Sequence, residues 1–299
     1  MPDDAAPAAS LARFGIGQSV RRVEDLRLLR GLGRYTDDLR ADGAAHLVFL
    51  RSPHAHARIL RIDTDAARAS PGVIAVLTGA DWIADGLGTL PCAVQRHRPD
   101  GSPMPRPPYP PLAHGAAKHV GDPVVAVIAA SRAAARDAAE AVEIEWDPQP
   151  AVTSGTAALA PGAPAVWPGL CDDNLCFRFA QGDERATAAA FARAAHVVSL
   201  DFRISRVSAN PMEPRALIAE WDSADERWTL RTGTQAPHGL RDSLAPVLRV
   251  SPAQLRIVSG DLGGGFGLRS HPTNEQAVAL WAARKLNRPV RWTGDRGEV

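Results

Sequence analysis

The sequence predicts a mixed α+β fold, built as two domains in succession. Short apolar runs of strand length alternate with longer runs of helical periodicity, which is typical of chains that mix both kinds of element. A stretch rich in Pro, Gly and Ala separates the halves, and 299 residues suit two domains. The expected divisions are a disordered leader over residues 1–14, a first domain over 15–150, a linker over 151–170, and a second domain over 171–299.

The first domain is predicted to combine strands with short helices. Apolar or alternating segments predict strands, and helix-forming segments with glycine or proline stops predict helices. The expected strands cover residues 45–50, 57–62, 73–77, 123–129 and 142–146, and the expected helices cover 26–30, 63–69 and 131–141. Eight prolines fall within residues 91–111. Because proline lacks a backbone donor, this stretch is predicted to be an irregular excursion outside any sheet.

The second domain is predicted from the same kinds of pattern. The expected strands cover residues 197–205, 215–222, 227–232 and 254–259, and the expected helices cover 183–195, 237–249 and 272–286. The last strand and the last helix flank a glycine-rich loop at residues 260–267.

This loop holds five glycines and one phenylalanine in eight residues. Glycine allows positive φ and brings backbone N–H groups close to a ligand, so such a loop suits phosphate or metal-bound oxygens. A dinucleotide fingerprint is excluded, because Leu268 or Ser270 stands where its third glycine should be. A phosphate-binding P-loop is excluded as well, since no Gly-Lys-Ser/Thr follows. A turn without a ligand is the remaining alternative.

Composition excludes several classes of function. The 34 basic and 33 acidic residues give a net charge of +1, which argues against nucleic acid or an anionic membrane as partner. No membrane span or secretory signal is evident, and three cysteines, an odd number, favour a cytoplasmic location. Cys171 and Cys176 lie five residues apart without a second ligand pair, so no metal site is predicted for them.

Seven short motifs occur in an order and spacing that point to one family. They cover residues 22–25, 31–39, 52–59, 71–79, 120–127, 210–215 and 232–238, and the glycine loop follows them. Together they resemble the large subunit of the molybdenum hydroxylases of the xanthine dehydrogenase, aldehyde oxidase and carbon monoxide dehydrogenase type. The resemblance implies an α/β hammerhead domain followed by the first part of a molybdopterin-binding α+β domain.

The resemblance also implies a set of cofactor-binding residues. Gln235 is expected to hydrogen-bond an oxygen ligand of molybdenum, a task that suits a neutral amide. Phe266 and Gly267 would face the metal, with the ring bordering the substrate, and Gly264 and Gly265 would line the same turn. No side chain of this chain is expected to ligate the metal directly.

Other residues near these motifs are given structural roles. Leu268-Arg269 stands where relatives often carry Gly-Lys or Asn-Lys, and the role of the arginine is left open. Glu213 is expected to border the substrate funnel or to form a structural ion pair beside Arg215. Structural histidines are expected at four positions, namely His54, His56, His238 and His271.

The resemblance implies oxidative hydroxylation of aldehydes or N-heterocycles, since Ser270 replaces the glutamate that relatives acting on purines often carry. The cofactor would be molybdopterin in its cytosine dinucleotide form. The expected partners are an iron–sulfur subunit, an FAD subunit and the rest of the large subunit, because the chain lacks the cysteine spacing of iron–sulfur clusters. The general-base glutamate would lie beyond Val299, so the chain alone is expected to be inactive. The alternative is a non-catalytic remnant or scaffold that folds its hammerhead domain without a cofactor.

Overall fold

The computed structural model describes residues 22–298. Two compact units are distinguished, one up to Arg34 and one from Tyr35 onward. In the first, helix α1 (Asp25–Leu29) is preceded by Arg22, whose guanidinium contacts the Asp25 carboxylate at 2.5 Å. The predicted leader over residues 1–14 lies outside the described residues.

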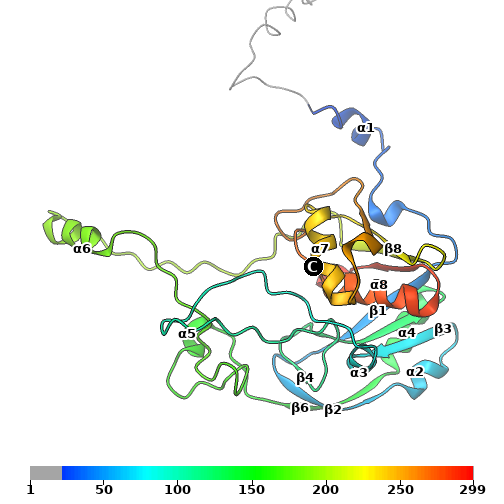
Figure 1. The fold of residues 1–299 in the computed structure, drawn as a ribbon, viewed down its shortest axis with the longest axis horizontal. Coiled ribbons are helices and arrows are strands. Elements are labelled where there is room, and N and C mark those ends of the chain that lie inside the picture. Colours follow the sequence, from blue (N-terminus) through cyan, green and yellow to red (C-terminus); the bar gives the residue numbers. More distant parts are fainter. Residues whose placement is uncertain (1–21, 299) are drawn as a thin grey trace, which may run out of the picture. The chain divides into compact units, whose positions relative to one another are not determined.

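A seven-stranded mixed sheet forms the centre of the second unit (Figure 1). Its order is β3 (Val73–Thr78), β5 (Pro123–Ala129), β1 (Ala45–Arg51), β10 (Val290–Thr293), β7 (Ala216–Asp222), β8 (Arg227–Thr232) and β9 (Leu255–Val258). Strand β1 pairs with β10 in parallel, with Ala45 opposite Val290. The sheet therefore continues from the first half of the chain into the second, and the proposed domain boundary near residue 150 stays a prediction.

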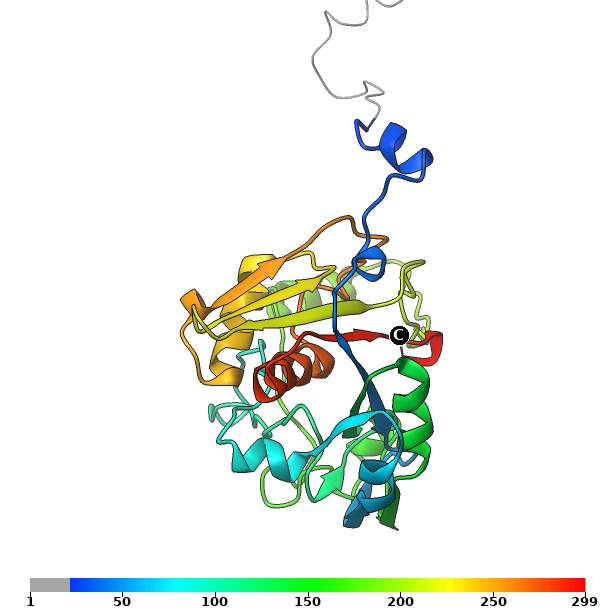
Figure 2. The same ribbon diagram turned by 90° about the vertical axis from the view of Figure 1, so that its right-hand side faces the viewer.

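Strand β5 is central to the first half because all seven of its residues are buried. Ala126 and Ile128 face a core shared with helices α7 (Pro237–Leu248) and α8 (Asn274–Leu286). Val125 and Val127 face a second core that helix α4 (Arg132–Glu140) covers. Helices thus lie on both faces of this part of the sheet, as Figure 2 shows for α4 and α8. A strand buried on both faces is expected to be apolar throughout, as this one is.

A smaller sheet packs against the second core. It has the order β4 (Ala116–Ala117), β2 (Ala57–Asp63) and β6 (Glu143–Pro148), and its strands are antiparallel. Ile59, Ile62 and Ile144 turn their side chains toward that core. The short helix η1 (Thr36–Asp38) precedes β1, and α2 (Asp65–Ala69) and α3 (Gly79–Ala84) lie on either side of β3 in sequence.

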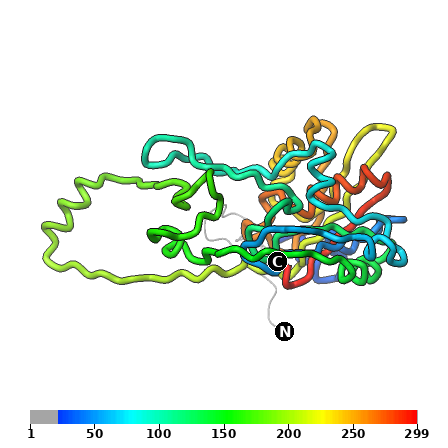
Figure 3. Tube along the Cα trace, turned by 90° about the horizontal axis from the view of Figure 1, so that it is seen from below, coloured from blue at the N-terminus to red at the C-terminus, as the bar shows by residue number. Residues whose placement is uncertain are grey.

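Two long excursions leave the sheets. Figure 3 shows the one between β6 and β7 as a wide green loop. The proline-rich one, residues 91–111, is irregular as predicted, with a single bridge between His97 and Pro103. The other carries α5 (Gly155–Ala158) and α6 (Glu184–Arg193). The predicted strand over residues 197–205 is wrong for this structure, because the segment is extended but pairs with no strand in the described chain.

The other predicted helices and strands are confirmed, with ends that agree to within about two residues. Four elements were missed, namely α3, β4, α5 and β10, in addition to the short 3-10 helices. Strand β10 is only four residues long, too short for a clear pattern, and it forms because β1 and β7 lie on either side of it. The remaining short elements are η2 (Pro252–Gln254) and η3 (Arg296–Glu298).

Candidate cofactor-binding site

The glycine loop connects β9 to α8 and takes a backbone path that favours glycine. Gly264 has φ of +108° and Gly267 has φ of +87°. Phe266, between them, is held at φ of +48°, which is uncommon for an aromatic residue. Strained backbone of this kind is concentrated at ligand-binding sites, where neighbouring contacts enforce it.

Gln235 is one of those contacts. Its Oε1 accepts a hydrogen bond from the Gly267 N–H at 3.0 Å. Gly265 lies directly against the same side chain, since a Cβ at Gly265 would stand 2.4 Å from the Gln235 Cδ and 2.7 Å from its Cγ. Only glycine permits this approach, so the structure brings together Gln235, Gly265 and Gly267 as predicted neighbours.

Glu213 supports the other end of the loop. Its Oε2 accepts the Gly263 N–H at 2.8 Å, and its own N–H donates to the Gly263 carbonyl at 3.3 Å. A Cβ at Gly263 would lie 2.4 Å from the Glu213 Cβ. Side chains therefore hold the loop at both ends. Glu213 contacts Gly263 near the start of the loop, and Gln235 contacts Gly267 at its end.

Arg269 links these contacts and is 6% exposed. Its Nη1 lies 2.6 Å from Glu213 Oε2, and its Nη2 donates to the Glu213 carbonyl. The Arg269 carbonyl in turn accepts from the Gln235 N–H at 3.0 Å and from the Thr234 hydroxyl at 2.9 Å. A single residue thus joins the three segments of the site, and its planar fork lets it contact both the side chain and the backbone carbonyl of Glu213.

The expected ion pair between Glu213 and Arg215 is wrong. Arg215 turns away and binds Glu275 at the start of α8, with Nη1 and Oε2 3.0 Å apart. Glu213 pairs with Arg269 instead, because the glycine loop brings residue 269 back over the turn at residues 211–215. Glu213 therefore shapes the loop, and its expected place beside a substrate funnel stays a prediction.

Several donors of the loop point to an outside acceptor. The backbone N–H groups of Gly264, Gly265 and Phe266 donate to no other group of the described chain. The Gln235 Nε2 has no partner there either, since Gly267 fixes the amide through its oxygen. These unpaired donors, gathered on one turn, suit an oxygen-rich cofactor such as molybdopterin.

Exposed apolar side chains surround these donors. Phe266 is 73% exposed and Leu268, two residues later, is 45% exposed, while Met212, next to the Glu213 that holds Gly263, is 87% exposed. Large apolar groups gathered at a set of unpaired donors are typical of a surface that something else covers.

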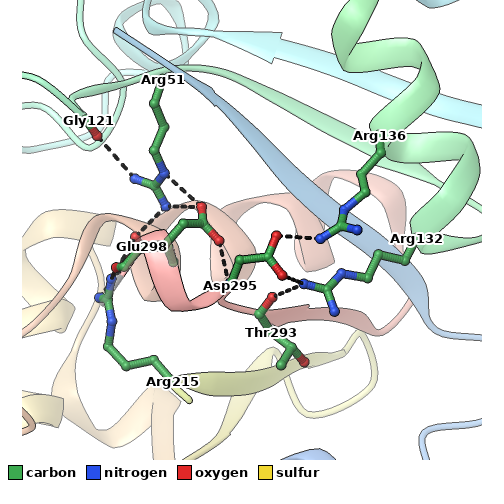
Figure 4. A network of polar contacts seen from close by, with 9 residues as sticks. Arg51, Gly121, Arg132, Arg136, Arg215, Thr293, Asp295 and Glu298 are labelled. Atoms are coloured by element: carbon green, nitrogen blue, oxygen red, sulfur yellow. Dashed lines mark hydrogen bonds and ion pairs between the residues drawn. The ribbon is translucent and has the colours of Figure 1, made fainter. Parts of the chain in front are cut away.

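A charged network lies beyond the loop and joins the two halves of the chain (Figure 4). Glu275 is buried, and it contacts Arg51 of β1 at 2.9 Å as well as Arg215. Burial opposes ionisation of Glu275, but the two guanidinium groups outweigh it, so the pKa of the carboxyl lies below its usual value. Glu298 binds Arg51 from the other side at 2.7 Å.

Asp295 extends the network to α4. Its carboxylate contacts Arg132 at 2.8 Å and also Arg136 (Figure 4). These pairs are partly exposed and contribute less than the buried ones. Their effect is to tie the end of the described chain to a helix of the first half.

A separate cavity of about 600 Å³ shares no lining residue with the glycine loop. Trp82, Tyr109 and Trp167 line it, together with Lys118 and Asp122. Burial raises the pKa of Tyr109 to about 12 and raises the pKa of Asp122, which indicates a poorly hydrated wall. One contact leads from its wall toward the end of the glycine loop, because the Tyr109 hydroxyl donates to Asn274 Oδ1 at the start of α8 at 3.3 Å.

The histidines that were given structural roles occupy varied surroundings. His54 packs edge-on against Trp146 with ring centres 5.3 Å apart, and His56 contacts the Pro150 carbonyl through Nδ1 at 3.2 Å. Neither ring lies near the glycine loop in these contacts. Among the described residues, no group of three His, Cys, Asp or Glu side chains could hold a metal ion, and no helix is long and apolar enough to cross a membrane.

Comparisons with known proteins identify the domains to which these residues belong. Residues 170–299 match the family model of the molybdopterin cofactor-binding domain. Residues 30–150 match that of the aldehyde oxidase and xanthine dehydrogenase a/b hammerhead domain.

Three relatives illustrate the similarity. The nicotine 6-hydroxylase large subunit of Paenarthrobacter nicotinovorans is 37% identical, with 96% of this chain and 34% of the relative covered. The carbon monoxide dehydrogenase large chain of Afipia carboxidovorans is 34% identical, with 95% and 35% covered. The crystal structure of quinoline 2-oxidoreductase from Pseudomonas putida 86 superposes with a TM-score of 0.83 at 38% identity, over 94% of this chain and 35% of the other.

The fold and the two family models define a hammerhead domain followed by the start of a molybdopterin cofactor-binding domain. The chain belongs to the molybdenum hydroxylase large-subunit family and corresponds to its N-terminal part. It spans about a third of the length of the relatives it matches.

The sequence missed two residues that organise the site. Arg269 was noted only as a departure from the usual loop ending, and Glu275 was not singled out. The sequence offered two signals. Arg269 is a charged residue next to a glycine-rich loop, and Glu275 is a charged residue in the first turn of a predicted helix. Neither pattern reveals burial, which requires the fold.

Proposed function

We propose that this chain supplies the N-terminal, cofactor-holding portion of a molybdenum hydroxylase that oxidises aldehydes or N-heterocycles. The observation that carries the proposal is the contact between Gln235 and the glycine loop, where Gly265 leaves no space for a Cβ and Gly267 orients the amide. A loop without a ligand, the alternative left open by the sequence, would not need this approach.

The chain's own residues hold and orient the cofactor in this proposal. The free N–H groups of Gly264, Gly265 and Phe266 would donate to its oxygens, and the Gln235 Nε2 would add a neutral donor. The exposed Phe266 ring would border the substrate and exclude water. When bound, the molybdenum cofactor supplies the two-electron oxidation that places an oxygen from water on an electron-poor carbon.

The substrate class is inferred from one side chain and from the relatives. Ser270 is short and uncharged, so it offers no carboxylate to a purine ring. Nicotine 6-hydroxylase and quinoline 2-oxidoreductase are named for N-heterocycles, and both are similar to this chain. We therefore infer a small N-heterocycle or an aldehyde rather than xanthine.

The remaining parts of the enzyme would come from other chains or further sequence. Relatives are named as large subunits and, in one case, as a subunit of a dehydrogenase complex. We propose the cytosine dinucleotide form of the cofactor, iron–sulfur and FAD subunits as electron acceptors, and a cytoplasmic location. The general-base carboxylate would lie in the rest of the large subunit, so the 299 residues alone would not turn over substrate.

The test uses the complete large subunit that contains this chain, purified with its partner subunits. We expect one molybdenum per subunit, cytidine monophosphate released on acid hydrolysis, and turnover of quinoline or benzaldehyde in preference to xanthine. A preference for xanthine would refute the substrate inference, as would a Ser270→Glu variant with unchanged purine affinity. Absence of molybdenum from the complete subunit would instead favour the non-catalytic remnant or scaffold.

A further inference from the structure

Residues 197–205 carry the pattern of a half-buried strand. The side chains of Val198, Leu200, Phe202 and Ile204 alternate with those of Ser199, Asp201, Arg203 and Ser205. Period-two alternation puts all four apolar side chains on one face of an extended chain. These four are 71% to 92% exposed in the structure. The apolar face, which the pattern predicts to be buried, is therefore exposed to solvent.

The backbone of this segment is equally unpaired. Residues 194–210 are assigned to no strand, and within the described chain no hydrogen bond joins the backbone of 195–209 to a strand. Amide and carbonyl groups in an extended segment form a template for pairing with another strand. Apolar side chains and unpaired backbone together indicate a strand whose partner lies outside this chain.

The end of the segment is fixed beside the cofactor loop. The Arg296 guanidinium donates to the Asn210 Oδ1 at 2.9 Å and to the Pro211 carbonyl at 2.5 Å. Pro211 lies against Gly264, since a Cβ at that glycine would stand 3.2 Å from the proline Cβ. The segment that follows residues 197–205 therefore ends against the loop that carries the unpaired donors.

We propose that residues 197–205 form a β-strand that pairs with the part of the molybdenum subunit that this chain does not span. The pairing, which rests on the proposed function, would place that part over Phe266 and Met212 and so complete the cofactor site. The occupant is argued from length, because the chain spans only 34% to 35% of its relatives while the molybdopterin-binding family model covers the segment. A partner with an open sheet edge and an apolar face fits this strand.

Hydrogen exchange tests the pairing directly, by comparing the 299-residue chain with the complete large subunit. Amides of residues 197–205 should exchange at the rate of unstructured peptide in the chain alone. In the complete subunit they should be slowed at least 100-fold, a protection typical of paired strands. Unchanged exchange in the complete subunit would overturn the proposal, as would protection in the isolated chain together with a dimeric mass.

A matched pair of double variants separates the two faces of the strand. Leu200→Asn with Phe202→Asn removes the apolar face, and Asp201→Asn with Arg203→Asn changes the polar face by the same number of residues. In the complete subunit, we expect the apolar-face variant to reduce the protection of amides 197–205 from hydrogen exchange at least 10-fold. The polar-face variant should retain that protection. Equal protection in both would contradict the proposal. All four side chains lie on a segment that is unpaired in the 299-residue chain, so neither double variant should change the unfolding midpoint of that chain. An unchanged midpoint verifies that both variants fold.

Molybdenum content, measured on the same samples, distinguishes this inference from the proposed function. Protection of the strand in a subunit that never holds molybdopterin would support the pairing and refute the function. Bound molybdopterin with residues 197–205 unprotected would refute the pairing alone.

Discussion

At Gly265 the difference between a hydrogen atom and a methyl group decides whether the cofactor loop can close on Gln235. The Gly265 backbone has no positive φ, so its need for glycine comes from contact alone. Gly264 differs, because its φ of +108° would strain any other residue. The loop therefore uses glycine for two separate physical reasons within two positions.

We predict that Gly265→Ala displaces the Gln235 side chain and frees the Gly267 N–H. In the complete large subunit, molybdenum content should fall about 10-fold, the size of effect typical when a group that positions a metal site is lost. Elemental analysis of purified protein measures it. Gly239→Ala is the matched control, because its Cβ would meet Ala236 at an ordinary 3.7 Å within helix α7. Equal molybdenum in both variants would show that the close approach is irrelevant.

Among the elements, α8 shows how a helix start can carry a structural charge. Glu275 stands in the first turn of α8, where the helix dipole favours a carboxylate. Arg51 reaches it from β1, and Arg215 reaches it from the turn before β7. One buried carboxylate thus fixes a helix against two strands of the central sheet.

Glu275→Gln should destabilise the folded chain by about 3 kcal/mol, because it leaves two guanidinium groups beside a neutral side chain. The pKa of Glu275 is lowered in the folded state, so its contribution is present above the ordinary glutamate pKa and is lost as pH falls through the folded value. Urea unfolding of the wild type and of Glu275→Gln, at neutral pH and below about pH 4, measures the difference between their free energies of unfolding.

The difference in free energy of unfolding between wild type and Glu275→Gln should become smaller as the pH falls. A difference independent of pH would contradict the role of ionised Glu275 as the partner of the two guanidinium groups. Glu220→Gln is the control at the β7–β8 pair, where Arg231 and Glu220 are each about a third or more exposed. We expect that change to cost less than about 1 kcal/mol.

For the second unit as a whole, the continuous sheet means that the hammerhead portion does not stand alone. Phe49 of β1 packs edge-on against Trp292 of β10, with ring centres 6.3 Å apart. Helix α8 contributes Ala277 through Ala283 to the same core as Ala126 and Ile128. Removing the second half would expose one face of β3, β5 and β1 and leave β1 at the sheet edge.

A fragment of residues 35–150 should therefore associate or unfold at lower urea than the 299-residue chain. Exposed apolar surface and an unpaired edge strand both favour self-association. Light scattering after size exclusion measures the mass, and urea titration measures the midpoint. A monomeric fragment with an unchanged midpoint would show that the two halves are independent despite their shared sheet.

The resemblance singled out Gln235, whereas the sequence by itself determined most of the helices and strands of both halves and the glycine loop. Periodicity, glycine and proline report local backbone preference, and local preference was sufficient there. The tertiary structure alone decided that Glu213 pairs with Arg269, 56 residues away, and that Arg215 pairs with Glu275. It also decided that residues 197–205 stay unpaired. Partners distant in sequence leave no local pattern, and a strand forms only where another strand supplies its hydrogen bonds.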